Sequence, residues 1–364
     1  MSNSGNGRGI DLDLASLAGE GAQQKVERRE GSEPLPYDVY GQVPSEGGTE
    51  TTYYGRPAIK EPVWIWSVPA YFFVGGATGA AATLGAVAQA IDNDGLRPLV
   101  RNCRVLSAAG GALGTFFLVI DLGRPERFLN MLRVFRPSSP LNVGSWILSA
   151  TSALAFSAAV AERSSGAVRR IGDLAGLGAG VTGIPMAGYT AVLLANTAVP
   201  LWQGTRRSMP LLFVSSSIAS AAALLQMPDI DDRQERTLTA FDLMGSLAEL
   251  AAAGLVGREA ATVEEVGRSL NEGLGGTLWN ASKYLSIASL GISLLPGGAA
   301  AKRRIGALLG IAGSLATRFA VFHAGKASSR DPRATFAMQR AGLGGKEATG
   351  RAAVTGPDGR RSDA

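Results

Sequence analysis

The sequence has almost none of the side chains that hold metal centres. Its 364 residues include one cysteine, Cys103, and one histidine, His323. A four-thiolate iron–sulfur cluster, a bis-histidine haem and a conventional zinc site all need more ligands than this. A disulfide within the chain is excluded by the same count. We therefore expect the chain to bind no metal, and to hold no cofactor covalently or through metal ligands.

Charge is also scarce, and it is unevenly placed. Charged residues make up 18% of the chain and hydrophobic residues 46%, and no charged residue occurs between Glu61 and Asp92. A helix needs about 20 apolar residues to cross a bilayer core. The net charge of +5 is spread over many connectors, which argues against nucleic-acid binding. The pattern indicates a multi-pass membrane protein.

We predict an all-α integral membrane protein of about eight transmembrane helices, arranged as two four-helix bundles. The membrane domain covers residues 61–326, between an N-terminal tail, 1–60, that is mostly disordered apart from a docking patch at 52–60, and a C-terminal tail, 327–364. The expected spans are residues 63–90, 100–121, 141–161, 171–199, 209–227, 237–256, 277–296 and 303–325. An even number of spans places both tails on one side, but arginine and lysine are nearly equal on the two sides, so orientation stays open.

The loop after the second expected span, from Asp121 to Pro137, is the most distinctive segment. Gly123 and Pro125 end the helix, and several arginines, among them Arg124, then alternate with apolar residues. Such a segment can lie in the membrane interface and present its cations to water. It is either a docking surface at the rim of a ligand site or an ordinary amphipathic connector.

Ionisable residues lie inside the last three expected spans. Asp242 and Glu249 are seven residues apart and share a helix face. Lys283 lies in the seventh span, and Arg318 and His323 lie in the eighth. Because charges in a membrane are costly, they are usually functional or paired. Glu249 could pair with Lys283 or Arg318, either as a structural lock between helices or as part of a proton route.

Two faces carry aromatic and polar side chains at membrane depth. Trp64, Ser67 and Tyr71 share a face of the first span, and Tyr189 and Asn196 share a face of the fourth. Such groups suit a quinone, which offers a flat ring to stack on and two carbonyls that accept hydrogen bonds. Anchoring at the membrane interface is the alternative explanation for the tryptophan.

The loop from Asp121 to Pro137, together with the segment Ser138-Ser-Pro-Leu-Asn-Val-Gly-Ser-Trp146, resembles the NrfD/PsrC family. These are membrane subunits of complex iron–sulfur molybdoenzymes such as polysulfide reductase. The shared pattern is D-L-G-R-P, then R-F-x-N-M-L-R-V and a helix entry S-P-x-x-x-G-S-W. The resemblance covers residues 52–340 and is closest to an actinobacterial branch associated with formate dehydrogenase. Further stretches that carry it are residues 53–57, 69–71 with 75–76, 189–200, and 318–325 with 330–332.

The resemblance implies an eight-helix anchor in a bacterial cell membrane. It would dock a ferredoxin-like iron–sulfur subunit, itself paired with a molybdopterin catalytic subunit, and exchange electrons between the clusters and the quinone pool. The family's quinone site lies among the first four helices, which places Asp121, Arg124, Tyr71 and Tyr189 near it.

Two positions depart from the family pattern, because Ser67 and Asn196 stand where acids are expected. This departure shifts the expected proton uptake to Asp121 or Glu249. Whether the chain is itself an enzyme stays open, since it is expected to carry no catalytic centre of its own. A purely structural anchor and a secondary transporter are the alternative functions.

Overall fold

The computed structural model describes residues 10–11, 16–17, 57–122, 125–295 and 300–341 of the chain. The chain divides into two compact units, residues 1–50 and 51–364. The described part of the first unit is an antiparallel pair of two-residue strands, β1 (Ile10–Asp11) and β2 (Ser16–Leu17). All regular secondary structure in the described residues of the second unit is helical, which confirms the predicted all-α class for the membrane domain.

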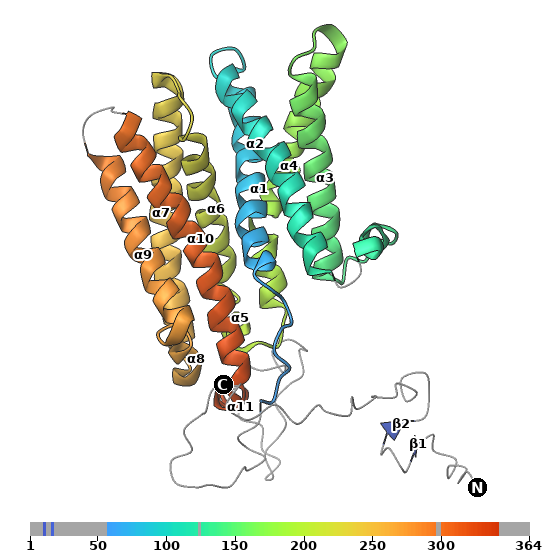
Figure 1. Ribbon diagram of the computed structural model, residues 1–364, viewed down its shortest axis with the longest axis vertical. Coiled ribbons are helices and arrows are strands. Elements are labelled where there is room, and N and C mark those ends of the chain that lie inside the picture. The colour runs from blue at the N-terminus through green and yellow to red at the C-terminus, as the bar shows by residue number, and fades with distance from the viewer. Residues whose placement is uncertain (1–9, 12–15, 18–56, 123–124, 296–299, 342–364) are drawn as a thin grey trace, which may run out of the picture. The chain divides into compact units, whose positions relative to one another are not determined.

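Eight helices of 17 to 31 residues make up most of the described second unit (Figure 1). They are α1 (Ser67–Asp92), α2 (Arg97–Asp121), α3 (Pro140–Ala161), α4 (Gly166–Ala195), α6 (Met209–Leu225), α7 (Asp232–Ala260), α9 (Gly273–Leu294) and α10 (Ala300–Arg330). Four shorter helices are described beside them: η3 (Pro125–Leu132), α5 (Pro200–Gly204), α8 (Glu264–Arg268) and α11 (Pro332–Arg340).

Six of the described helices, α1, α2, α3, α4, α7 and α10, are long and apolar enough to cross a membrane. Helix α6 is apolar but has only 17 residues, and α9 is not among the six. Large apolar side chains on the outer helices are well exposed, for example Phe156 at 63% and Val181 at 69%, as expected for surfaces that face lipid. The multi-pass membrane fold is confirmed, while the count of eight spans stays a prediction.

The long helices form two groups, α1–α4 and α6, α7, α9 and α10, which lie side by side (Figure 1). Helix α1 contacts α2, α4, α6 and α10, so 72% of its membrane span is buried, against 28% for α2. Close approach depends on small residues. A Cβ added to Gly79 of α1 would lie 2.5 Å from the carbonyl oxygen of Gly183 on α4. Helix α1 therefore packs both against its own group and against the second group of helices.

The end of the bundle at which residues 57–66 lead into α1 is called the tail end, and the opposite end is called the far end. At the tail end the indole of Trp64 stacks on Trp202 of α5, with ring centroids 5.8 Å apart. Trp202 Nε1 donates to the carbonyl oxygen of Val321 on α10 at 2.9 Å. A Cβ on Gly325 would lie 2.1 Å from that indole. Three segments that are distant in sequence are thus packed together at this end.

An ionic clasp joins the segment before α1 to the end of α10. Glu61 lies 3.0 Å from Lys326 Nζ and 2.7 Å from Arg330 Nε. Lys326 also donates to the carbonyl oxygen of Trp64 at 3.2 Å. Partial burial by itself would raise the pKa of Glu61. The hydrogen bonds and charges of Arg330 and Lys326 outweigh that effect and leave the pKa below its usual 4.5.

The clasp predicts a pH-dependent contribution to stability. Because the folded-state pKa of Glu61 is depressed, the ion pairs stabilise the fold above about pH 4.5 and stop doing so as the pH falls through the lower folded value. We expect Glu61→Gln to lower the unfolding temperature in detergent at pH 7, and the gap from wild type to close on acidification. Glu264→Gln is the control, since that side chain is 89% exposed. A gap that stays constant with pH would contradict the prediction.

Candidate functional site

Two tyrosines from different helices meet near the tail end. The hydroxyl of Tyr71, in the second turn of α1, is in hydrogen-bond contact with the hydroxyl of Tyr189 on α4. Their ring centroids are 6.4 Å apart, and the planes are inclined by 60°. Tyr71 is 1% exposed and Tyr189 is half-buried. The structure thus joins two side chains that the sequence placed on separate helix faces, one to two turns from the tail end.

Glycines make room for both tyrosine rings. A Cβ on Gly144 of α3 would lie 2.0 Å from Cε2 of Tyr189, so no larger residue fits there with the ring in place. A Cβ on Gly114 of α2 would lie 3.4 Å from the ring of Tyr71, which is ordinary contact. The helices α2 and α3 therefore pack closely against the two rings at these glycines and fix the positions of the rings.

Two buried hydroxyls on residues close to the tyrosines in sequence have no hydrogen-bond partner among the described residues. They are Ser67 Oγ, four residues before Tyr71 on the same face of α1, and Thr190 Oγ1, which follows Tyr189. Both residues are fully buried. A buried polar group without a partner is costly, so a ligand atom that bonded to either hydroxyl would relieve that cost.

The other predicted site residues lie around this centre or apart from it. Asp121, the last residue of α2, accepts a hydrogen bond from the backbone N–H of Ile65 at 3.2 Å. Asn196, just after α4, is exposed, and its side chain donates to the carbonyl oxygen of Val192 at 2.8 Å. Asn196 is thus turned to its own helix. Arg124 lies outside the described residues.

Glu249 lies in the second group of helices, together with Arg318. Thr317 Oγ1 donates to Glu249 Oε1 at 3.2 Å. The next residue, Arg318, donates to the carbonyl oxygen of Phe213 at 2.8 Å and to Ser217 Oγ at 3.0 Å. Its guanidinium lies 3.9 Å from the centroid of the Phe213 ring. Both charged side chains are buried, and no ion pair of 4.0 Å or less joins them in the described part of the chain.

Helix α1 separates this charged pair from the tyrosines. A Cβ on Gly75 would lie 3.3 Å from the ring of Tyr71, whereas a Cβ on Gly76 would lie 3.4 Å from Arg318 Nη2. Consecutive glycines of one helix therefore face the two sites. Glu249, predicted as part of a helix lock or a proton route, therefore lies on the other side of α1 from Tyr71, which was predicted for the quinone site.

Asp242 is buried one to two turns further toward the far end of α7. Ser246 Oγ donates to one carboxyl oxygen at 3.2 Å, and Ser293 Oγ of α9 donates to the other at 3.1 Å. Lys283, the other cation predicted as a partner for Glu249, lies with Nζ 5.7 Å from the ring centroid of Trp279. Of the two cations predicted as partners for Glu249, Arg318 is therefore the better candidate, because it is buried in the same cluster as Glu249.

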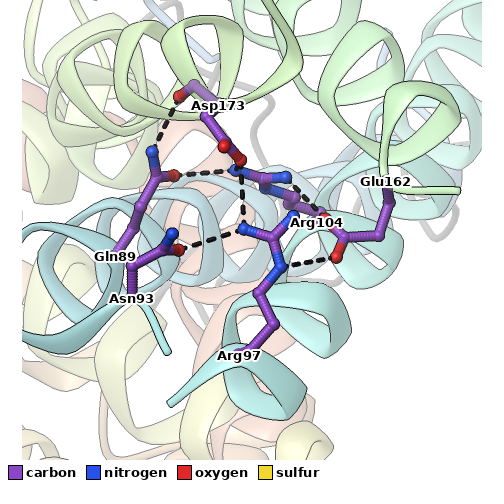
Figure 2. Close-up of polar contacts among 6 residues, drawn as sticks. All are labelled: Gln89, Asn93, Arg97, Arg104, Glu162 and Asp173. Carbon is purple, nitrogen blue, oxygen red and sulfur yellow. Dashed lines mark hydrogen bonds and ion pairs between the residues drawn. The ribbon is translucent and has the colours of Figure 1, made fainter. Parts of the chain in front are cut away.

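An ion network closes the far end of the first group (Figure 2). Glu162 lies 2.8 Å from Arg97 and 2.5 Å from Arg104, and Asp173 lies 3.1 Å from Arg97 and 2.7 Å from Arg104. Gln89 of α1 accepts from Arg104 at 2.8 Å and donates to the backbone of Asp173 at 3.0 Å. Three helices and the cap of a fourth are linked by charges that balance one another.

The second expected span, residues 100–121, includes Arg104 but leaves out Arg97, whereas the structure places both on α2, with Arg104 only 5% exposed. The sequence could have indicated that Arg97 and Arg104 act together, because residues seven positions apart share a helix face. The acids were not predicted, because Glu162 and Asp173 are more than 50 positions away in sequence.

The family described as polysulphide reductase, NrfD, matches residues 57–328. The chain belongs to the NrfD family. A comparison with curated proteins finds no match. Membership confirms the resemblance drawn from the loop that follows α2, while the actinobacterial branch stays a prediction. As an NrfD protein, the chain is a multi-pass membrane subunit of an oxidoreductase complex of the polysulphide reductase type.

The far-end network gives this NrfD protein a testable source of stability. Replacing Arg104 with Gln leaves Glu162 and Asp173 with one arginine between them, and breaking a buried ion pair typically costs about 3–5 kcal/mol. We expect a large loss of unfolding free energy for Arg104→Gln in detergent. Arg101→Gln, at an exposed position of the same helix, should change it by less than about 0.5 kcal/mol. Equal losses for the two variants would show that the network contributes nothing.

Proposed function

We propose that this subunit exchanges electrons between a partner iron–sulfur protein and membrane quinone, and that the quinone binds at Tyr71 and Tyr189. The partner would be a ferredoxin-like subunit paired with a molybdopterin catalytic subunit. The observation that carries the proposal is the contact of the two tyrosine hydroxyls, and the unpartnered hydroxyl of Ser67, one turn before Tyr71 on the same face of α1, adds to it. Donors gathered at membrane depth, between aromatic rings, suit the carbonyls and ring of a quinone.

The chemistry requires two electrons and two protons for each quinone reduced to quinol. Each carbonyl oxygen gains one proton, so hydroxyls that can donate and accept suit both forms of the ligand. The bond between Tyr71 and Tyr189 would open on binding, and each hydroxyl would turn to a quinone oxygen. The hydroxyl of Ser67, on the same face of α1 as Tyr71, would supply a further donor.

The electrons would come directly from the partner's cluster, because one cysteine and one histidine cannot hold a relay in this chain. The position of the tyrosines supports docking at the tail end. Tyr71 is the fifth residue of α1, so it lies only about 6 Å along the helix from its start. Helices α5, α8 and α11 contact one another at that end, and the predicted rim residue Asp121 lies there, bonded to the backbone of Ile65. A partner on this surface would come closest to the tyrosines.

We assign proton supply to two groups. Asp121 lies at the rim, where water has access, and Glu249 is buried in the second group of helices. Arg318 reaches from the side of Glu249 to Gly76 of α1, which is the wall shared with the tyrosine site. The alternative for Glu249 and Arg318 is a lock between α7, α10 and α6 that takes no part in proton transfer.

Removal of one tyrosine hydroxyl tests the site. We expect Tyr189→Phe and Tyr71→Phe each to remove a hydrogen bond worth about 0.5–1.5 kcal/mol, and hence to raise the quinone KM by about two- to ten-fold. The measurement is quinone-linked turnover in membranes that carry the assembled complex. Tyr284→Phe is the matched control, since that ring is 73% exposed on α9. Unchanged KM and kcat in both site variants, with assembly intact, would remove the tyrosines from the site.

A purely structural anchor predicts a different result in a second assay. If the subunit only holds its partners in the membrane, a quinone analogue will show no saturable binding to the purified complex. Saturable binding that weakens in Tyr189→Phe is the outcome that we expect.

A further inference from the structure

A cavity of about 390 Å³ lies between α7, α9 and the connection that joins them, residues 261–272, which contains α8 and is called the α8 segment. The cavity belongs to the group of helices that does not contain the tyrosines. Small-molecule sites in proteins typically measure about 300–1,000 Å³. None of the residues proposed for the quinone site lines this cavity. It therefore needs an explanation of its own.

One wall of the cavity is an open apolar surface of α7. Gly254 and Gly257 both line it, and a Cβ added to either glycine would meet no atom within 4 Å. Gly79 shows the opposite behaviour, since its Cβ would overlap the backbone of a neighbouring helix. Glycines in membrane helices usually allow another group to come close. Here the structure describes no such group.

A cation projects into this apolar cavity. Lys283 is the eleventh of the 22 residues of α9, and it lines the cavity together with Trp279. No described acidic side chain forms an ion pair with it, and its contact is with the Trp279 ring, 5.7 Å from Nζ to the centroid. An ammonium at membrane depth is costly unless it pairs or reaches the interface. The charge favours an anionic occupant.

The direction of the lysine indicates where the anion would lie. Trp279 is one turn nearer the start of α9, so Nζ points toward the tail end, as helical side chains generally do toward the N-terminus. At that end Asn271 also lines the cavity. Arg258, in the last turn of α7, is exposed nearby along the chain. The cavity thus combines a polar side chain at the tail end, a cation deeper on α9 and an apolar wall, and together they form an amphipathic site.

The position of the α8 segment distinguishes two kinds of occupant, a lipid and a transmembrane helix of another protein. Gly267, Leu270 and Asn271 line the cavity at the tail end, so they stand in the way of a straight helix that would continue out of the membrane there. A lipid ends in a head group at this level, and its flexible chain can follow an irregular wall. The shape thus favours a lipid over a transmembrane helix.

We propose that this cavity is a binding site for one anionic phospholipid. Its head group would lie along Gly254 and Gly257, with the phosphate paired to Lys283 Nζ. An acyl chain would lie further inward, against Leu250 and Ile287. The lipid would complete the packing between α7 and α9. The site is independent of the quinone proposal, and either one can fail without the other.

Lipid retention by the full chain tests the proposal. The purified protein is exchanged into detergent with phosphatidylglycerol or phosphatidylcholine, and bound lipid is counted by native mass spectrometry. We expect one phosphatidylglycerol to be retained in preference to phosphatidylcholine. Lys283→Gln should lower that retention by about ten-fold through loss of the charged contact. Lys302→Gln should not change it, because that lysine bonds to the carbonyl oxygen of Leu295 at the far end.

A second variant tests the open wall of α7. Gly257→Leu fills the cavity without changing charge, so it should reduce retention of both lipids. Equal retention of phosphatidylglycerol by wild type and Lys283→Gln, or equal retention of the two lipids by wild type, would overturn the proposal. Cross-linking of Gly257→Cys to another subunit in the assembled complex would also overturn it, because the occupant would then be a protein helix. Lys283→Gln alone decides the matter if Gly257→Leu fails to fold.

Discussion

A charged side chain inside a bilayer has no water to solvate it, so its partners must come from the protein or from a lipid head group. This constraint explains where the ionisable residues of the described helices lie. Arg104 is buried only because Glu162, Asp173 and Gln89 surround its guanidinium. Arg318 is buried against backbone and hydroxyl oxygens and the face of an aromatic ring. Both arginines join helices to one another, so each charge also fixes the packing around it.

The same constraint leaves the tyrosine site free of charge. Tyr71 and Tyr189 satisfy each other through their hydroxyls, which allows a polar centre in the membrane without an ion pair. A neutral pair can open for a neutral ligand at lower cost than an ion pair can. Gly75 and Gly76 allow α1 to serve this site on one side and the charged cluster on the other. The close packing of α1 between the two sites therefore depends on these two glycines, which have no side chain.

Much of this fold could be predicted from the sequence, because uncharged stretches long enough for a bilayer are a strong signal. Tyr71, Tyr189 and Glu249 could be named for the same reason, as polar groups at membrane depth. Their partners could not be identified, since Tyr71 and Tyr189 are separated by 118 positions and helix pairing is not written in a hydropathy pattern. The partners of Arg104 could not be identified either, because Glu162 and Asp173 are 58 and 69 positions away in sequence. Lys283 was expected near an acid, and the structure instead places it in an open cavity beside Trp279.

We propose that quinone binds between α1 and α4, where it can exchange electrons with a partner's cluster. A photoreactive quinone analogue, cross-linked to the assembled complex and mapped by mass spectrometry of the labelled peptides, tests this most directly. We predict labelling of the peptides that contain Tyr71 and Tyr189, and its suppression by excess native quinone. Labelling confined to other subunits, or unaffected by the competitor, would contradict the claim.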